Sequence, residues 1–349
     1  MIRVPLHKAL ESLAWLEGTW RTENQGSGKY PTIKDFNYYD EISFMSLGQP
    51  MFNYTAQSFS NSDLKKPMHR ETGFLKVNPG TNQVTLISAH NFGLTTIECG
   101  EITDKTINLN STDITRIKEA KVPHVTQVRR EFKLHDNCLE YVFYMATSNT
   151  PVLTEHLQAK YMKVSEETTR LLTTTAAKME MKVLQLHELL HVLAWLEGTW
   201  ITDEPAMGMY PTIKPFNYYD QINITSIGQP MFNYIAQSWH PDSGIPMHRE
   251  NGFLQILPGT NKVVLSLIGN IGAFTVEQGD LMSNDNNTLD LNSNNILLTD
   301  ATVPTFSPLT KTRRVYKRNG DNLELIFYMA TAKTPELTEH LRAKYRKVT

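Results

Sequence analysis

Histidines at matching places in two halves of the chain are the residues best suited to do chemistry. His156 and His340 each follow Leu-Thr-Glu, and His69 and His248 each follow Pro-Met. A neutral imidazole is a common metal ligand, and it can also exchange a proton near neutral pH. Without a motif, an ordinary partly exposed histidine is the commoner role. The surrounding sequence must therefore decide between a ligand and a structural side chain.

These histidines belong to an internal repeat that is as long as a domain. Identical blocks recur in the same order, namely 13–20 with 193–200, 30–34 with 210–214, 48–54 with 228–234, and 153–157 with 337–341. Solenoid repeats have periods of about 20–50 residues, so this repeat is a duplicated domain. The sequence predicts one copy at 1–164 and a second at 181–349. Residues 165–180 have little apolar periodicity and are predicted to be a linker.

The composition favours an ordinary folded protein. Of 349 residues, 40% are apolar and 9% aromatic, which is enough for two cores, and the net charge is −2. This balance gives no reason to expect a nucleic-acid or membrane partner. The chain has no apolar run near the roughly 20 residues of a membrane span, and it has only two cysteines. We expect a soluble cytoplasmic protein, with nuclear entry left open.

The sequence pattern of each repeat predicts one helix followed by many short strands. Leu6, Leu10 and Leu13 are spaced for one face of a helix, which Gly18 is expected to end. Short runs rich in β-branched residues follow, separated by Gly, Asn or Asp. An antiparallel barrel closed at one end by the helix is predicted, and a β-sandwich is the competing architecture. A barrel of this size can hold one small ligand.

Several sequence blocks together resemble the nitrobindin family. These blocks are residues 18–20, 30–32, 67–74 and 156–159, with their counterparts in the second repeat. The chain is most similar to the C-terminal haem-binding domain of the animal THAP-domain members. The resemblance implies two ten-stranded antiparallel barrels, each preceded by a short capping helix and each holding one ferric haem b. Family members bind nitric oxide and are described as isomerising peroxynitrite to nitrate.

The resemblance also implies roles for individual residues. His156 and His340 match the proximal iron ligands, and Thr32 and Thr212 match residues that contact the haem. Six further positions match residues that line the family's pocket, and these are Met68, His69, Met145, Met247, His248 and Met329. The haem iron, rather than any side chain, would carry the chemistry.

Two side-chain pairs have competing interpretations. His69 and His248 either hydrogen-bond a ligand on the iron or pair with a nearby glutamate. The paired arginines at 129–130 and 313–314 are expected on a solvated face, and a clamp for haem propionates is the alternative.

We expect a ferric haem protein that binds nitric oxide and acts as an enzyme that isomerises peroxynitrite. The alternative is a haem or nitric-oxide sensor without turnover, or a carrier of a fatty-acid-like molecule. Two isolated cysteines cannot form the zinc finger of the THAP-domain members, so no DNA partner is expected. Packing of the two barrels as an intramolecular pseudo-dimer is a further expectation.

Overall fold

The computed structural model describes residues 5–31, 33–60, 66–120, 122–164, 185–210, 213–281, 287–298 and 307–348. The chain divides into two compact units, Met1–Val183 and Leu184–Thr349. The predicted linker at 165–180 lies outside the described residues. Within the described parts of the chain, helices are too short or too polar to cross a bilayer.

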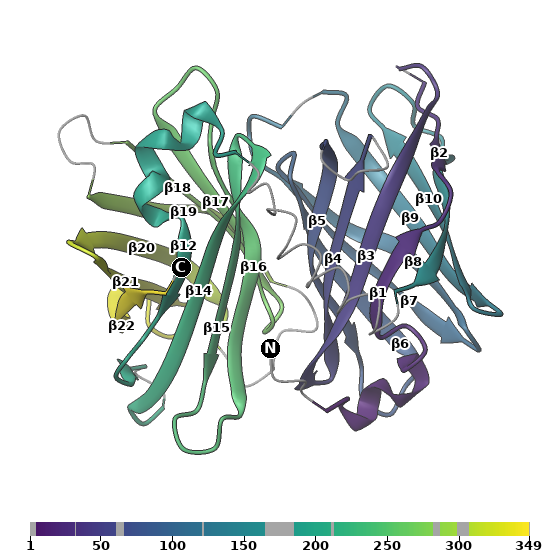
Figure 1. Ribbon diagram of the computed structural model, residues 1–349. Coiled ribbons are helices and arrows are strands. Elements are labelled where there is room, and N and C mark those ends of the chain that lie inside the picture. Colours follow the sequence, from purple (N-terminus) through teal and green to yellow (C-terminus); the bar gives the residue numbers. More distant parts are fainter. Residues whose placement is uncertain are drawn as a thin grey trace, which may run out of the picture. The chain divides into compact units, whose positions relative to one another are not determined.

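The first domain is almost entirely strands (Figure 1). Its elements are η1 (Lys8–Leu13), β1 (Gly18–Thr22), β2 (Gly26–Gly28), β3 (Phe36–Gln49), β4 (Met51–Phe59), β5 (Pro67–Val77), β6 (Gln83–His90), β7 (Leu94–Thr103), β8 (Thr106–Arg116), β9 (Val125–His135), β10 (Cys138–Thr147) and β11 (Thr154–Lys163).

The second domain repeats this order. Its elements are η2 (Glu188–Leu196), β12 (Gly198–Ile201), β13 (Ala206–Gly208), β14 (Phe216–Gln229), β15 (Met231–Trp239), β16 (Pro246–Ile256), β17 (Lys262–Gly269), β18 (Ala273–Asp280), β19 (Thr288–Leu298), β20 (Leu309–Asn319), β21 (Asn322–Thr331) and β22 (Thr338–Lys347).

The strands of each domain close into a ring. From β3 to β11, each strand pairs antiparallel with the next, and the short strands β1 and β2 both pair with β3 and β11. Because β1 and β2 share one position, the ring has ten positions. In the second domain, β12 and β13 share the position between β14 and β22 in the same way. The prediction of two ten-stranded antiparallel barrels is confirmed, and the sandwich is wrong.

Period-two alternation of side chains produces the barrel core. Along β10, Leu139, Tyr141 and Phe143 are buried while the residues between them are more exposed. Inside the first barrel, the Phe132 ring packs edge-on against Phe44, with centroids 5.7 Å apart. Burying one such ring stabilises the fold by about 1.5–3 kcal/mol.

The opening helix of each domain is a 3₁₀ helix. Leu10, Leu13 and Leu16 are each completely buried, and their spacing of three residues is the repeat of a 3₁₀ helix. The helix ends at Leu13, before the predicted stop, and Gly18 instead begins β1 with a φ of +117°. In the first barrel, η1 lies at the lower end of the view and β2 toward the upper end (Figure 1).

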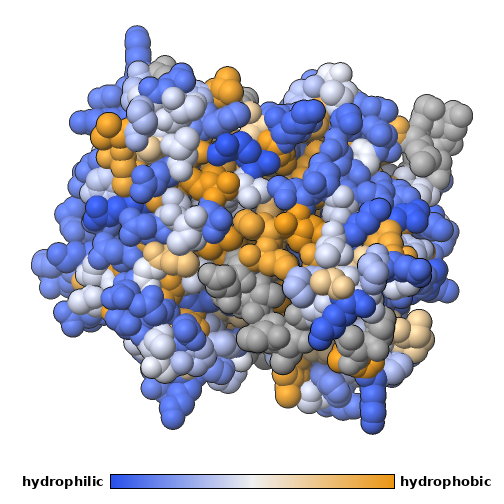
Figure 2. Space-filling model, turned by 180° about the vertical axis from the view of Figure 1, so that it is seen from behind, coloured by the Kyte–Doolittle hydropathy of each residue, from blue (hydrophilic) through white to orange (hydrophobic). Residues whose placement is uncertain are grey.

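The visible surface is mainly hydrophilic, with apolar patches between the polar side chains (Figure 2). Some large apolar side chains are well exposed, among them Ile33 in the first domain and Met207, Met209 and Ile213 in the second. Met207 lies in the short strand β13, Met209 and Ile213 follow it, and Ile33 follows the counterpart strand β2. Exposed apolar groups gathered on one segment often mark a place where a ligand binds.

Candidate functional site

His156 occupies the extra position of a β-bulge in the last strand of the first barrel. Phe143 of β10 pairs with Leu157, whereas its neighbour Tyr144 pairs with Glu155, so His156 has no partner on β10. A bulge of this kind can redirect a side chain against the alternation of the strand. The imidazole is 3% exposed. His340 occupies the matching bulge of β22 and is 1% exposed.

Two contacts with one backbone unit fix the ring of each histidine. The N–H of Lys29, directly after β2, donates to the carbonyl oxygen of His156 at 2.8 Å, and Nδ1 of His156 donates to the carbonyl of Lys29. Met209 and His340 form the same reciprocal pair, with Nδ1 2.9 Å from the Met209 carbonyl. A carbonyl can only accept, so Nδ1 carries the proton. In His156 a neutral ring then has its lone pair on Nε2, where a metal ion can bind.

Aromatic rings cover one side of each histidine. The Tyr30 ring is stacked on His156 with centroids 4.6 Å apart and planes within 8°, and the Phe36 ring is also parallel to Tyr30, with centroids 5.9 Å apart. In the second domain, Tyr210 lies 4.8 Å from His340, tilted by 33°. The stack holds the imidazole in one orientation and keeps that side apolar.

The Nε2 atoms differ between the two copies. Nε2 of His156 lies 3.3 Å from the Thr154 hydroxyl, which can donate to it. Nε2 of His340 lies 3.2 Å from the Thr338 hydroxyl and also 3.1 Å from the carbonyl oxygen of Met329. A carbonyl only accepts, so the Met329 contact is a hydrogen bond only when Nε2 of His340 carries a proton, and the contacts of His340 do not fix one tautomer as those of His156 do. A metal ion at Nε2 of His340 would have to displace this contact.

A buried arginine organises a second polar group inside the first barrel. Arg130 of β9 is 0% exposed and donates to both oxygens of Glu98, at 2.6 and 2.9 Å. It also donates to Oε2 of Glu71 at 2.9 Å, and its guanidinium lies over the Phe143 ring. Burial alone would lower the pKa of Arg130, but the two carboxylates raise it well above its ordinary value. Arg130 is therefore a permanent charge within the barrel.

The two groups share the interior of the barrel. Burial, followed by the negative charge of Glu71, raises the pKa of the Tyr30 phenol well above its ordinary value. Burial would also raise the pKa of Glu71, but Arg130 and the hydrogen bond with His69 hold it well below its ordinary value. Glu71 is thus ionised, and its negative charge acts on Tyr30, the ring that covers His156.

The second domain builds the same arrangement with different details. Arg314 donates to Glu277 at 3.0 Å and to both oxygens of Glu250 at 3.0 Å. Burial would raise the pKa of Glu250, but Arg314 lowers it to about 2.

A buried tyrosine–aspartate pair lies elsewhere in each barrel. The Tyr161 hydroxyl donates to Asp40 at 2.7 Å, and the Tyr345 hydroxyl donates to Asp220 at 2.7 Å. Burial raises the pKa of Asp40 to about 7.

The prediction of a solvated face is wrong for Arg130 and Arg314. In each arginine pair the second residue points into the barrel and is almost fully buried, because successive strand residues face opposite sides. The first members, Arg129 and Arg313, are partly exposed, at 40% and 38% of their side chains. Arg130 and Arg314 bind carboxylates within the barrel.

The other predicted site residues are placed as follows. Met68 and Met145 pack against the core of the first barrel, and Met247 packs against that of the second. His69 and His248 are partly exposed and pair with Glu71 and Glu250, at 3.0 and 3.3 Å, as the structural interpretation predicts. Thr32 and Thr212 lie outside the described residues.

Several residues of these groups carried no signal in the sequence. Glu98 and His90 lie in strands whose alternation can be read, but neither belongs to a block that marks a site. Tyr30 lies in a matching block, yet its stacking on a histidine far along the chain depends on the bulge. The signal that could have found Arg130 is its alternation with Val128 and Phe132, which are both buried.

A closed antiparallel barrel of this size belongs to a class of folds that can hold one small ligand, and the buried histidine on its last strand is a potential metal ligand. The chain belongs to the THAP4-like, heme-binding beta-barrel domain family, whose model matches residues 9–163 and again 189–347. The resemblance found in the sequence is thereby confirmed, once for each half.

Relatives of this chain carry a common name. A human protein named peroxynitrite isomerase THAP4 is 41% identical over 161 residues, and the match covers 46% of this chain and 28% of that protein. A Nocardia farcinica protein named peroxynitrite isomerase is 41% identical over 160 residues, covering 45% of this chain and 91% of that protein. The crystal structure of Rv2717c from M. tuberculosis matches with 35% identity and a TM-score of 0.41, covering 46% of this chain and 99% of that one.

Proposed function

We propose that each domain binds one ferric haem b, with Nε2 of His156 and Nε2 of His340 as the iron ligands. The reciprocal pairing of His156 with the Lys29 backbone carries this proposal, because it places the proton on Nδ1 and leaves Nε2 for the metal. His340 pairs with Met209 in the same way, and there the metal would displace the contact between Nε2 and the Met329 carbonyl. Family membership supports haem as the cofactor.

The surroundings suit a flat, largely apolar cofactor. Tyr30 stacks on His156, and Tyr210 lies tilted beside His340. Exposed apolar side chains lie in β13 or follow β2 and β13 along the chain. Burial raises the pKa of Tyr210 to about 12, so this phenol stays neutral beside the ligand. The proposed haem contacts of Thr32 and Thr212, and the pocket positions of Met68, Met145, Met247 and Met329, belong to the same proposal.

The proposed activity is the isomerisation of peroxynitrite to nitrate, with nitric oxide as a second ligand. Relatives that are 41% identical over one domain are named peroxynitrite isomerases. A haem iron would supply the site that binds these small molecules and rearranges the substrate. The histidine would hold and orient that group, and the aromatic rings would exclude water from it. Arg130 and Arg314 each compensate two buried carboxylates, which keeps the charges of the barrel interior paired.

Haem titration of the purified apoprotein tests the proposal. We expect a Soret band that saturates at two haems per chain, at one in either His156→Ala or His340→Ala, and at none in the double variant. His135→Ala is the matched control, because its side chain is 70% exposed. Specific uptake that survives in the double variant would disprove the ligand assignment.

Stopped-flow decay of peroxynitrite tests the activity. We expect the ferric protein to speed the decay with nitrate as product, and the double histidine variant to lose this acceleration. A haem-loaded protein that binds nitric oxide without accelerating the decay would instead be a sensor.

A further inference from the structure

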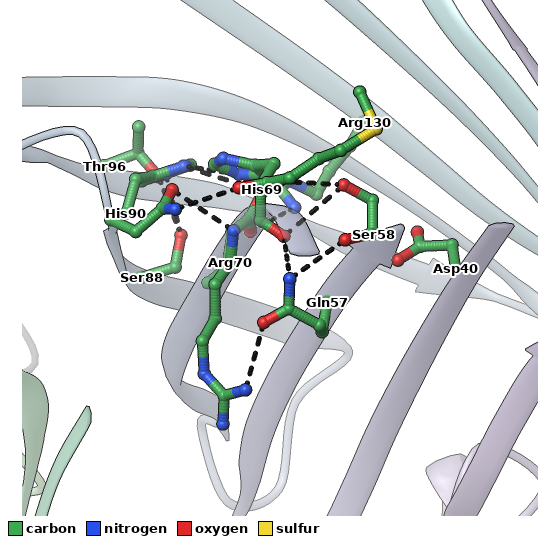
Figure 3. Close-up of polar contacts among 12 residues, drawn as sticks. Asp40, Gln57, Ser58, His69, Arg70, Ser88, His90, Thr96 and Arg130 are labelled. Carbon is green, nitrogen blue, oxygen red and sulfur yellow. Dashed lines mark hydrogen bonds and ion pairs between the residues drawn. The ribbon is translucent and has the colours of Figure 1, made fainter. Parts of the chain in front are cut away.

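Three potential metal ligands converge in the first barrel, apart from His156. His69 and Glu71 lie two residues apart on one face of β5, and His90 ends β6 directly opposite Glu71 in the ladder. Nε2 of His69 lies 3.0 Å from Oε1 of Glu71 and 3.2 Å from Nδ1 of His90. Nδ1 of His90 lies 3.6 Å from the same Glu71 oxygen. The two histidines are labelled in Figure 3.

These separations are those of ligands around one small ion. Two ligands about 2.1 Å from a metal lie about 3.0 Å apart at a right angle and about 3.4 Å apart at the tetrahedral angle. The three measured separations lie near these values, so one ion can reach all three atoms with only slight movement. Two imidazole nitrogens with one carboxylate oxygen suit zinc or ferrous iron, and hard cations such as Mg²⁺ or Ca²⁺ prefer oxygen ligands.

The surrounding hydrogen bonds direct the lone pair of His90 toward this point. Nε2 of His90 lies 3.3 Å from the Ser88 hydroxyl and 3.4 Å from the Thr96 hydroxyl (Figure 3). The Thr96 hydroxyl donates its own proton to Glu98 at 2.7 Å, so its oxygen is left to accept one from His90. With the proton on Nε2, Nδ1 of His90 faces His69 and Glu71 with a lone pair. Support of this kind fixes metal-binding histidines in many sites.

The arginine leaves one oxygen of Glu71 for the histidines. Arg130 holds Glu98 by both oxygens but contacts only Oε2 of Glu71, which also accepts from Tyr54 at 3.2 Å. Oε1 of Glu71 therefore faces the two imidazoles. His69 is 32% exposed at its side chain, whereas Glu71 and His90 are at most 6% exposed. An ion can enter from the side of His69.

We propose that His69, Glu71 and His90 form a binding site for one divalent transition-metal ion, zinc or ferrous iron, in the first domain only. Binding requires the proton that Nε2 of His69 shares with its two neighbours to move to Nδ1 through solvent. The remaining positions on the ion stay open to water or a small ligand. This site does not depend on the proposed haem.

The second domain differs from this site at two points. Gly269 stands where the first domain has His90, so one ligand is missing. Arg314 donates to both oxygens of Glu250, whereas Arg130 contacts only one oxygen of Glu71. Glu250 therefore has no oxygen that contacts the histidine without also contacting the arginine. The second domain, with His248 and Glu250 but no third ligand, is therefore an internal control for the three-ligand cluster of the first domain.

Zinc titration of the haem-free full-length chain, against a chromophoric chelator, tests the proposal. We expect one tight ion per chain and a loss of more than about 100-fold in affinity in His90→Gly. That variant reproduces the second domain, which folds with glycine at this position, and circular dichroism checks the fold. His248→Ala is the matched control and should keep the ion.

Cobalt absorption gives a second readout, because a bound Co²⁺ with nitrogen ligands absorbs in the visible. We expect a spectrum in the wild type that His90→Gly abolishes. Absence of tight binding in the wild type, or equal binding in His90→Gly, would show that the cluster is only a hydrogen-bond network. Haem uptake by His90→Gly is measured separately, so a failure of the metal site is distinguished from a failure of the haem sites.

Discussion

Nδ1 of His340 lies 2.9 Å from the carbonyl oxygen of Met209, although 131 residues separate the two in the chain. The first domain makes the same contact with Lys29 in place of methionine. Because the partner is a backbone carbonyl, the side chain at this position is free to differ between the copies. Both copies share the contact between the residue after the short strand, β2 or β13, and the bulge histidine of β11 or β22, and this contact places a hydrogen-bond acceptor at Nδ1 of each histidine.

Removing the ring that covers His156 should weaken haem binding. In Tyr30→Ala the imidazole loses a stacked partner whose contribution is about 0.5–1.5 kcal/mol, so we expect roughly 2–10-fold weaker haem uptake in the first domain. Tyr30→Phe keeps the ring and should bind as the wild type does. Titration in the His340→Ala background reads the first domain alone, and equal affinity of the Ala and Phe variants would contradict the role given to the ring.

The fold could be predicted from the sequence because each signal for it is local or repeated. The alternation of Leu139, Tyr141 and Phe143 marks a strand with one buried face, and the duplicated blocks place the same elements twice. The resemblance then supplied the number of strands. Closure by two short strands that share one position has no local signal, since it depends on pairing across more than one hundred residues.

The candidate site could be predicted only in part. His156 was predicted from the repeated block 153–157, but its burial depends on a β-bulge, and no residue type in the sequence indicates that bulge. Arg130 beside Arg129 was expected to be a solvated pair, because a charged side chain is usually exposed, although its alternation with Val128 and Phe132 places it on the inward face of the strand. His90 became visible only when the ladder placed it opposite Glu71.

Removing the buried arginine should destabilise the first domain strongly. Arg130→Met leaves Glu71 and Glu98 buried without their counter-ion, and breaking a buried pair in this way costs about 3–5 kcal/mol. Arg129→Met removes a partly exposed ion pair and should cost at most about 1 kcal/mol. Urea denaturation gives both free energies of unfolding. If Glu71→Gln and Glu98→Gln together fail to restore any stability to Arg130→Met, the unpaired charges are not the cause.

The stability of the second domain should fall as pH rises from about 4 to about 7. Burial raises the pKa of Asp220 to about 7, although the Tyr345 hydroxyl donates to it. The folded state therefore binds more protons than the unfolded state in this window, and stability present below pH 4 is lost as Asp220 ionises. Asp220→Asn cannot ionise, so its advantage over the wild type should grow by up to about 1.4 kcal/mol per pH unit.

Urea denaturation at several pH values measures this difference, and parallel profiles for wild type and variant would contradict it. The first domain is less suitable, because burial lowers the pKa of His90 to about 3. A lowered histidine pKa makes the folded state bind fewer protons between about pH 3 and 6.5. Stability then rises with pH, which opposes the effect of Asp40.

A methyl group at Gly73 should disrupt the sheet where β5 meets β6. A Cβ atom there would lie 1.9 Å from the carbonyl oxygen of Ile87, and a backbone atom of the neighbouring strand cannot move aside as a flexible side chain can. We expect Gly73→Ala to destabilise the domain by more than about 3 kcal/mol, at the upper end of single substitutions. Gly80→Ala is the control: its φ of +82° strains an alanine, but no atom lies within 4 Å, so about 1 kcal/mol is expected. Similar losses for both variants, measured by thermal unfolding, would mean that the ladder can shift to admit a methyl group.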